Sequence, residues 1–332
     1  MDRILLSHGG GGEETHRLIR SLFLRNFSNS VLERLEDAAV LGGVDRIAFT
    51  TDSFTVSPPF FPGGDIGKLA VAGTVNDLAM VGAEPLYICL SFILEEGFAL
   101  DLLEKIVRSA SEEARRNNVL VVGGDTKVVP RGQGGGVFIT ASGIGRVVRE
   151  GISPRSMRLG DAIVVSGSVG NHGACILAQR EGFEAEGTLL SDCRSMWDVV
   201  RDVLSEGVEV RAMRDPTRGG LAEVLNEWAD QTKLEIEIEE EKVPVRDAVR
   251  GLCELLGFDP LHLACEGTVV FAVAPDHTDK LLRILRDHPH CREAELIGRV
   301  TGVGEGRVLV KTPYGTRRRL EPPSGELLPR IC

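Results

Sequence analysis

Four aspartates occur in surroundings where an unpaired carboxylate would be costly. Asp37 lies in EDAAVL, Asp52 ends a predicted strand in FTTDSF, Asp77 interrupts an apolar predicted helix, and Asp125 follows a predicted strand in VVGGDTK. A carboxylate in apolar surroundings must be paired or metal-bound, and oxygen ligands from separate elements suit Mg²⁺ that also contacts phosphates. Turn capping is the alternative for Asp52 and Asp125, but it explains Asp77 poorly. The pattern favours a metal ligand at Asp77 and leaves the other three open.

Two glycine-rich segments each precede a predicted helix: GSVGNHG at 167–173 and DPTRGG at 215–220. Glycines let an anion approach the free N–H groups of a helix start, and Arg218 adds a charge-assisted partner. An ordinary helix start explains the first segment equally well and the second less well. At the N-terminus, SHGGGG at 7–12 is either an anion-binding loop or a flexible end.

The segment GGDIGK at 63–68 resembles a phosphate loop only superficially. The Walker pattern needs a glycine five places before its Gly-Lys pair and a Ser or Thr after it, where this chain has Pro62 and Leu69. A nucleotide would therefore be held in another way. Lys68 either meets a phosphate at the helix start or is a solvated surface lysine.

Three further side chains have types suited to group transfer. Cys332 is the last residue in the sequence, where a thiolate on a mobile tail can carry a group covalently; the alternative is an accident of the terminus. Lys127 stands two residues after Asp125 and could move a proton or hold phosphate. Glu266, in CEG, is either a base with a raised pKa or a turn residue.

The composition fits a two-domain globular protein and excludes other classes. The 332 residues are 42% hydrophobic and 26% charged, with a net charge of −11, so neither intrinsic disorder nor nucleic-acid binding is expected. Seven cysteines without a CxxC pair argue against a disulfide framework or a zinc ribbon. No signal peptide and no membrane span is recognised, so we expect a cytoplasmic protein without a membrane partner.

Strands and helices alternate along the chain, which predicts an α/β (α+β) fold. The periodicity stops at 151–160, so we place an N-terminal domain at 1–150, a second α/β domain at 151–311, and a flexible tail at 312–332. Predicted strands cover 46–52, 85–94, 119–122, 137–144, 162–166, 234–238, 268–273, 297–303 and 308–311. Predicted helices cover 65–80, 99–117, 173–180, 193–205, 221–230, 245–256 and 275–287.

The motifs occur together in one known order. SHGGGG, TDSFTVSP, FPGGDIGKLAVAGTVNDLAM, GGDTKVV, DPTRGGL, CEG and a terminal PRIC resemble the HypE family of hydrogenase maturation proteins along essentially the whole chain. That family belongs to the superfamily of aminoimidazole ribonucleotide synthetase, selenophosphate synthetase and thiamine monophosphate kinase. The resemblance implies a two-domain aminoimidazole ribonucleotide synthetase-like fold. It also implies a homodimer whose N-terminal domains pair into a shared β-barrel, with ATP in a cleft beside it.

The resemblance also implies a reaction. The carbamoyltransferase HypF would carbamoylate Cys332, and ATP with Mg²⁺ would drive dehydration of the thiocarboxamide to a thiocyanate. The cyano group would then pass to iron on the HypC–HypD complex, for the [NiFe] hydrogenase site. This chemistry is reasonable: an amide oxygen is a poor leaving group, phosphorylation makes it a good one, and a base must remove the amide protons.

The resemblance assigns roles to individual positions. The base would be Glu266 or Lys127. The metal ligands would be Asp37, Asp52, Asp77 and Asp215. The nucleotide would be held by Gly10, Gly11, Asp65, Gly67, Lys68, Asp125, Thr126, Arg218, Gly219 and Gly220.

Two alternatives remain. Selenophosphate synthetase needs a nucleophilic cysteine near its N-terminal glycine loop, but this chain has none before Cys89. A nucleotide-binding scaffold that only presents Cys332 to partners would not turn over ATP in response to carbamoylation of that cysteine.

Overall fold

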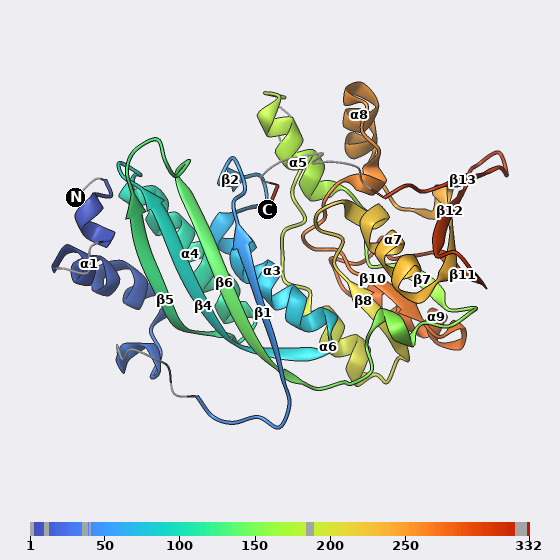
Figure 1. Cartoon of the computed structure of the whole chain (residues 1–332), viewed down its shortest axis with the longest axis horizontal. Coiled ribbons are helices and arrows are strands. Elements are labelled where there is room, and N and C mark those ends of the chain that lie inside the picture. The colour runs from blue at the N-terminus through green and yellow to red at the C-terminus, as the bar shows by residue number, and fades with distance from the viewer. Residues whose placement is uncertain (1–2, 10–12, 35–38, 40, 184–188, 323–330) are drawn as a thin grey trace.

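The N-terminal half is built on a four-stranded sheet (Figure 1). The computed structural model describes residues 3–9, 13–34, 39, 41–183, 189–322 and 331–332. The strand order is β1-β6-β4-β5, in which only the β4–β5 pair is parallel. The strands are β1 (Ile47–Phe54), β4 (Ala83–Glu95), β5 (Leu120–Val129) and β6 (Val137–Val147). The short strands β2 (Phe60–Phe61) and β3 (Gly64–Asp65) pair separately.

Two helices, α3 (Ile66–Met80) and α4 (Leu100–Arg116), cover one face of this sheet, and both lie near the bounds predicted from the sequence. The side chain of Asp65 caps α3 by accepting hydrogen bonds from the N–H groups of Gly67 and Lys68. A Cβ on Gly67 would lie 2.1 Å from the carbonyl oxygen of Ile106, so only glycine lets α3 and α4 approach this closely. Because α3 lies between the sheet and the C-terminal half, it is buried on nearly every side.

No helix or strand of the described residues covers the other face of the four-stranded sheet, which is called the open face below. Side chains along β1 alternate between exposed and partly buried, with Ile47 57% and Phe49 65% exposed. On β4, Ile93 is 38% exposed on the same face. Such alternation is typical of a sheet with one covered face, but here the uncovered face presents large apolar side chains.

A helical segment that the sequence analysis missed precedes this sheet. It consists of η1 (Leu6–Gly9), α1 (Glu13–Leu18), the π-helical η2 (Ile19–Leu24), α2 (Arg25–Phe27) and η3 (Leu32–Arg34). It packs beside β4 and β5, with the rings of Phe23 and Phe92 5.1 Å apart. The expectation that Asp125 follows a strand is also wrong, because β5 continues through Asp125 to Val129. Its neighbour β4 supplies a partner for every residue of that extension.

The C-terminal half contains a seven-stranded sheet in the order β13-β12-β9-β11-β7-β10-β8. Helices cover both of its faces, so Val164 packs toward the N-terminal half while Val165 packs with α7. The strands are β7 (Ala162–Val165), β8 (Val210–Arg214), β9 (Leu234–Glu239), β10 (Val270–Val273), β11 (Glu295–Val303), β12 (Arg307–Lys311) and β13 (Arg317–Arg319).

Five α-helices accompany this sheet, at or near the predicted positions. They are α5 (Asn171–Arg180), α6 (Trp197–Ser205), α7 (Gly220–Thr232), α8 (Asp247–Leu256) and α9 (Thr278–Asp287). The short 3₁₀ segments are η4 (Pro154–Ser156), η5 (Glu240–Lys242), η6 (Pro260–His262) and η7 (Pro275–His277). Two strands were missed: β8 is short, and β13 lies in the segment expected to be a tail. The antiparallel pairing of β13 with β12 extends the ordered domain beyond Thr312.

The two halves share one hydrophobic core. Asn76, on α3, is fully buried; its amide donates to the carbonyl oxygen of Arg194 at 3.1 Å and accepts from the N–H of Met196 at 2.8 Å. A satisfied buried amide of this kind fixes the register between α3 and the C-terminal half. The adjacent residue, Asp77, is thereby held at the boundary between the halves. Among the described residues, no helix is both long and apolar enough to cross a bilayer.

Candidate active site

The final two residues lie inside the molecule, between the two halves (Figure 1). The main-chain oxygen of Cys332 accepts hydrogen bonds from the N–H of Thr55 at 2.8 Å and from its hydroxyl at 3.1 Å. The carbonyl oxygen of Ile331 lies 2.8 Å from Nε2 of His172. Ile331 itself is 5% exposed and belongs to the shared core. The end of the chain is therefore docked between the residue that follows β1 in one half and the helix that contains His172 in the other.

The Cys332 thiol faces the acidic residues that the sequence analysis singled out. The pKa of this thiol is raised to about 12, chiefly by burial and then by the carboxylates of Glu266, Asp52 and Asp215, while Arg218 opposes them. The docked thiol is consequently protonated and a poor nucleophile at neutral pH. The structure thus brings Cys332, Glu266, Asp52, Asp215 and Arg218 to one place.

Glu266 is a buried carboxyl group, and one of its two oxygens lacks a hydrogen-bond partner in the described structure. It is 1% exposed, and within the described part of the chain its Oε1 has no hydrogen-bond partner. Burial and then the neighbouring carboxylates, Asp215 first, raise its pKa well above the usual value. A buried carboxyl oxygen without a hydrogen-bond partner lowers the stability of the fold. Near the Cys332 thiol, such a group could accept or donate a proton in a reaction at that sulfur.

The candidate metal ligands approach one another from three elements: Asp52 from β1, Asp77 from α3, and Asp215 from the loop before α7. Burial raises the pKa of Asp215 to about 7, and repulsion from Asp77 contributes. Burial also raises the pKa of Asp77, whose carboxylate accepts a hydrogen bond from the Thr50 hydroxyl at 2.6 Å. Within the described ranges, no three His, Cys, Asp or Glu side chains are arranged to hold a metal ion together.

The DPTRGG segment is a tight helix start pressed against the loop before Glu266. Gly219 and Gly220 both have positive φ, of 75° and 62°. A Cβ on Gly220 would meet the carbonyl oxygens of Leu263 and Leu261 at 2.6 and 2.7 Å. Glycine is needed here for both the backbone conformation and the close approach. The exposed Arg218 is held beside the Cys332 thiol as a result.

At the start of α3, the predicted nucleotide ligands already have structural partners. Asp65 caps the helix and also accepts a hydrogen bond from the Ser109 hydroxyl. The ammonium group of Lys68 donates to the carbonyl oxygen of Gly63 at 2.9 Å and stays partly exposed. Lys68 lies near Cys193 in the C-terminal half: burial raises the pKa of that thiol well above its usual value, and the charge of Lys68 partly offsets the rise.

Asp125 and Lys127 do not join the Cys332 cluster. They form an exposed ion pair of 3.0 Å on β5, which is separated from β1 by β4 and β6. Three strand spacings amount to about 14 Å. Lys127 also faces the open side of the sheet, since its pairing partner Ile93 is exposed there.

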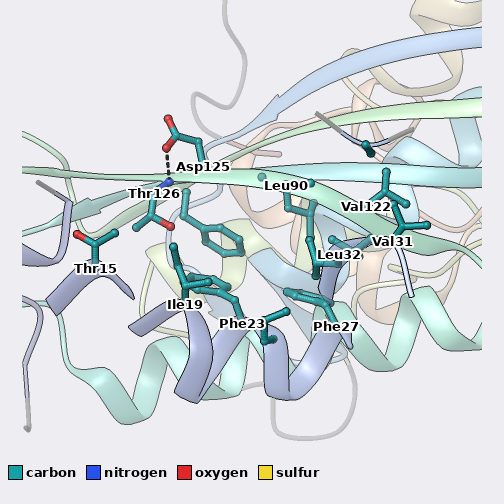
Figure 2. A pocket seen from close by; sticks show the side chains of 16 residues that line it. Thr15, Ile19, Phe23, Phe27, Val31, Leu32, Leu90, Val122, Asp125 and Thr126 are labelled. Carbon is teal, nitrogen blue, oxygen red and sulfur yellow. Dashed lines mark hydrogen bonds between the residues drawn. The ribbon is translucent and has the colours of Figure 1, made fainter. Parts of the chain in front are cut away.

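A pocket of about 240 Å³ lies beside this pair, between the N-terminal helical segment and the sheet (Figure 2). Its wall is largely apolar, and Asp125 and Thr126 stand at one end. Aromatic rings from the helical segment, Phe23 and Phe27, point toward the strands across it. Sequence reasoning missed this pocket because it missed the helical segment. Gly10, Gly11 and Asp37 lie outside the described residues.

Comparison with known proteins places the chain in a family. The profile of the AIR synthase related protein, N-terminal domain, matches residues 35–147, and that of the C-terminal domain matches residues 158–311. The carbamoyl dehydratase HypE of Azotobacter vinelandii is 46% identical over 328 residues, covering 98% of this chain and 96% of that protein. The chain belongs to the HypE carbamoyl dehydratase family.

Solved HypE structures have the same fold. The structure of HypE in complex with ATP superimposes with a TM-score of 0.96 at 46% identity, covering 99% of both chains. A HypE–HypF complex matches with a TM-score of 0.80 at 44% identity, over 92% of this chain and 99% of that one. The two-domain aminoimidazole ribonucleotide synthetase-like fold predicted from the motifs is confirmed.

Three residues at this HypE-like site were not singled out from the sequence. Asp192, 8% exposed, accepts hydrogen bonds from the N–H groups of Glu266 and Gly267 at 3.1 Å each. Thr55 and His172 hold the docked end of the chain. The TDSFTVSP and GSVGNHG motifs do contain Thr55 and His172, but nothing local distinguishes a residue that binds a segment more than 150 positions away.

Proposed function

We propose that this protein is an ATP-dependent carbamoyl dehydratase that acts on its own Cys332 in hydrogenase maturation. The substrate is the S-carbamoyl group, Cys332–S–C(=O)–NH₂. Transfer of the γ-phosphoryl group of ATP to the amide oxygen leaves ADP and an iminophosphate. Loss of the amide protons and of phosphate then forms the C≡N bond, giving Cys332–S–C≡N. The overall balance is thiocarboxamide plus ATP to thiocyanate, ADP and phosphate.

The observation that carries this proposal is the docked chain end, which holds the Cys332 thiol near enough to Glu266 for that carboxylate to raise the thiol pKa, while Oε1 of Glu266 has no hydrogen-bond partner among the described residues. Glu266 is the preferred base, because a carboxylate with a raised pKa is a strong proton acceptor once it is ionised. Arg218, which already faces the thiol, would balance negative charge that develops on the phosphorylated oxygen.

ATP binding is supported by the HypE–ATP structure, which this chain matches along its length. One or two of the carboxylates of Asp52, Asp77 and Asp215 would hold Mg²⁺, which completes its coordination shell with phosphates and water. Burial raises the pKa of Asp215 to about 7, and the nearby carboxylates of Asp77 and Asp52 contribute, so a bound cation would relieve their repulsion. When bound, Mg²⁺ would neutralise the triphosphate and align it for transfer.

In a homodimer, Lys127 and the apolar pocket would both have a role. The open sheet face carries Phe49, Ile47 and Ile93 exposed, and pairing two such faces into a shared barrel would bury them. Lys127 and Asp125 lie on that same face, far from Glu266 of their own chain, so they would serve the site of the second copy. The pocket beside Asp125 and Thr126 would take the nucleobase, since its wall is largely apolar.

HypF is the proposed donor of the carbamoyl group, which the HypE–HypF structure supports. The HypC–HypD complex is the proposed acceptor of the cyano group. Carbamoylation requires Cys332 to leave the docked position, because its thiol is protonated and partly buried there. Transfer of the cyano group requires the same movement, because the docked thiocyanate would be partly buried too.

The test is the intact mass of this protein after incubation with HypF, carbamoyl phosphate and ATP, with peptide mapping of Cys332. We expect a carbamoyl adduct on Cys332 that loses the mass of one water only when MgATP is present. A Cys332→Ala variant should acquire no adduct at this position. An adduct that never loses water, with no ADP released in response to it, would favour the scaffold alternative.

A further inference from the structure

The imidazole of His172 lies between the docked tail and the interior of the C-terminal half. It is fully buried, with Nε2 2.8 Å from the carbonyl oxygen of Ile331 and Nδ1 2.8 Å from the hydroxyl oxygen of Ser191. The ring of Phe61 stands edge-on to it at 5.2 Å. His172 therefore bridges Ile331, near the docked end of the chain, and Ser191, within the C-terminal half.

The hydrogen-bond partners of His172 determine which ring nitrogen carries the proton. A carbonyl oxygen can only accept, so Nε2 of His172 must donate to Ile331. The hydroxyl oxygen of Ser191 already accepts from the N–H of Cys193 at 3.0 Å, which leaves its own hydrogen to be donated to Nδ1. Burial lowers the pKa of His172, in agreement with a neutral ring held in the Nε2–H tautomer.

The backbone around His172 is built to hold it in place. A Cβ on Gly173 would meet the N–H nitrogen of Ala264 at 2.9 Å, and the N–H of Gly173 donates to the carbonyl oxygen of Ala264 at 2.9 Å. The N–H of Gly170 donates to the Cys265 sulfur at 3.1 Å. The glycines of GSVGNHG thus press the start of α5 onto the residues just before Glu266. The ring that contacts the tail and the carboxyl group that faces the thiol share one rigid support.

We propose that His172 is a positioning residue that latches the chain end in the dehydration position, with its tautomer set by Ser191. This inference rests on the proposed function and deepens it, because it assigns the control of the tail's two positions. Undocking would break the hydrogen bond between the Nε2–H of His172 and the carbonyl oxygen of Ile331, with the free-energy cost typical of losing a buried hydrogen bond. The latch favours dehydration, which needs the docked thiol, and opposes carbamoylation, which needs it free.

The test uses two substitutions of the same residue in the full-length chain. His172→Phe keeps an aromatic ring beside Phe61 but removes both nitrogens, whereas His172→Gln keeps an N–H donor. The first readout is the rate at which iodoacetamide alkylates Cys332 without ATP or partners. Cleavage after Glu326 places Cys332 in a peptide where it is the sole cysteine. N-acetylcysteine in a parallel reaction serves as the reference for the reactivity of a free thiol.

We expect alkylation of Cys332 in His172→Phe to be roughly tenfold faster than in the wild type, the factor for loss of one buried hydrogen bond. His172→Gln should recover most of the wild-type protection. With HypF and carbamoyl phosphate, His172→Phe should be carbamoylated at least as fast as the wild type, while the pre-carbamoylated variant should lose water more slowly with MgATP. A general loss of folding would slow both carbamoylation and dehydration. Unchanged or faster carbamoylation together with slower dehydration therefore identifies the latch.

Thr55→Val and His277→Phe keep the inference falsifiable. Thr55→Val removes one hydroxyl donor to Cys332 and should also speed alkylation of Cys332. It therefore tests the latch even if His172→Phe fails to fold. His277→Phe removes an imidazole whose Nδ1 accepts from the N–H of Glu209, and it should leave Cys332 unaffected. Unchanged alkylation in both His172→Phe and Thr55→Val overturns the latch. Absence of dehydration in the wild type would instead contradict the proposed function while leaving the alkylation result to judge the latch.

Discussion

Asp192 holds the main chain of Glu266: its carboxylate accepts the N–H of Glu266 at 3.1 Å, while the carboxyl group of Glu266 itself has an oxygen without a partner in the described structure. The same carboxylate accepts the N–H of Gly267 at 3.1 Å and the hydroxyl of Thr268 at 3.2 Å. Asp192, whose carboxylate accepts several hydrogen bonds, therefore positions Glu266, whose carboxyl group has an oxygen that accepts none. The rigidity of the first allows the second to face Cys332 without collapsing onto a local donor.

Asp192→Asn should weaken this support. The amide keeps one acceptor oxygen and places an NH₂ group against N–H donors, so we expect the free energy of unfolding in urea to fall by about 2 kcal/mol. Dehydration of carbamoylated Cys332 should slow, and carbamoylation by HypF should not. Asp259→Asn is the matched control, since Asp259 caps η6 by accepting the N–H of Leu261 at 2.9 Å. It should lower stability without slowing dehydration, and an equal slowing in both variants would contradict the assignment.

Asp215→Asn should stabilise the fold in a pH-dependent way. Burial raises the pKa of Asp215 to about 7, above the ordinary value expected in the unfolded chain. Between these two values the folded state binds the proton and the unfolded state does not, so stability is lost as the pH rises toward 7. The variant removes that loss. Its gain in unfolding free energy, measured without nucleotide or metal, should be larger at pH 8 than at pH 5, by about 3 kcal/mol. An equal gain at both pH values would refute the raised pKa.

Lys127 and Glu266 should complement each other between subunits. If Lys127 of one copy serves the site containing Glu266 of the other, Lys127→Ala and Glu266→Gln are each inactive alone. In a mixed dimer, one of the two sites then retains both groups. Random exchange at equal concentrations makes half of the dimers mixed, so about one quarter of wild-type dehydration should return. No recovery after verified subunit exchange would place Lys127 outside the catalytic site of the partner.

Phe49→Asp should prevent dimer formation. Phe49 is 65% exposed on the open sheet face, and a carboxylate there would be buried without a partner in a shared barrel. Analytical ultracentrifugation should give a monomer for the variant and a dimer for the wild type. Tyr314→Asp, at a residue that is 92% exposed in the C-terminal half, is the control and should remain dimeric. A dimeric Phe49→Asp would mean that copies associate through another surface.

Local sequence patterns predicted most of the elements, because hydrophobic periodicity and turn residues act over short distances. The helices at α3 and α4 and the strands at β4 and β6 appear near their predicted bounds. The misses have local reasons as well. The helical segment at 13–27 follows a glycine run, β13 is only three residues long, and β5 extends through two glycines because β4 supplies a pairing partner for it.

The sequence by itself determined the family, through motifs whose order runs along nearly the whole chain, and it singled out Cys332, Glu266 and Asp215. Only the tertiary structure decided how these groups meet. It docks Cys332 on Thr55, 277 positions away, places His172 against Ile331, and separates Lys127 from Glu266 by the width of a sheet. Such contacts depend on which strand ends and helix starts the packed core brings together. Short-range periodicity carries no information about that arrangement. The sequence therefore identified the reactive side chains, and the tertiary structure showed which residues they contact.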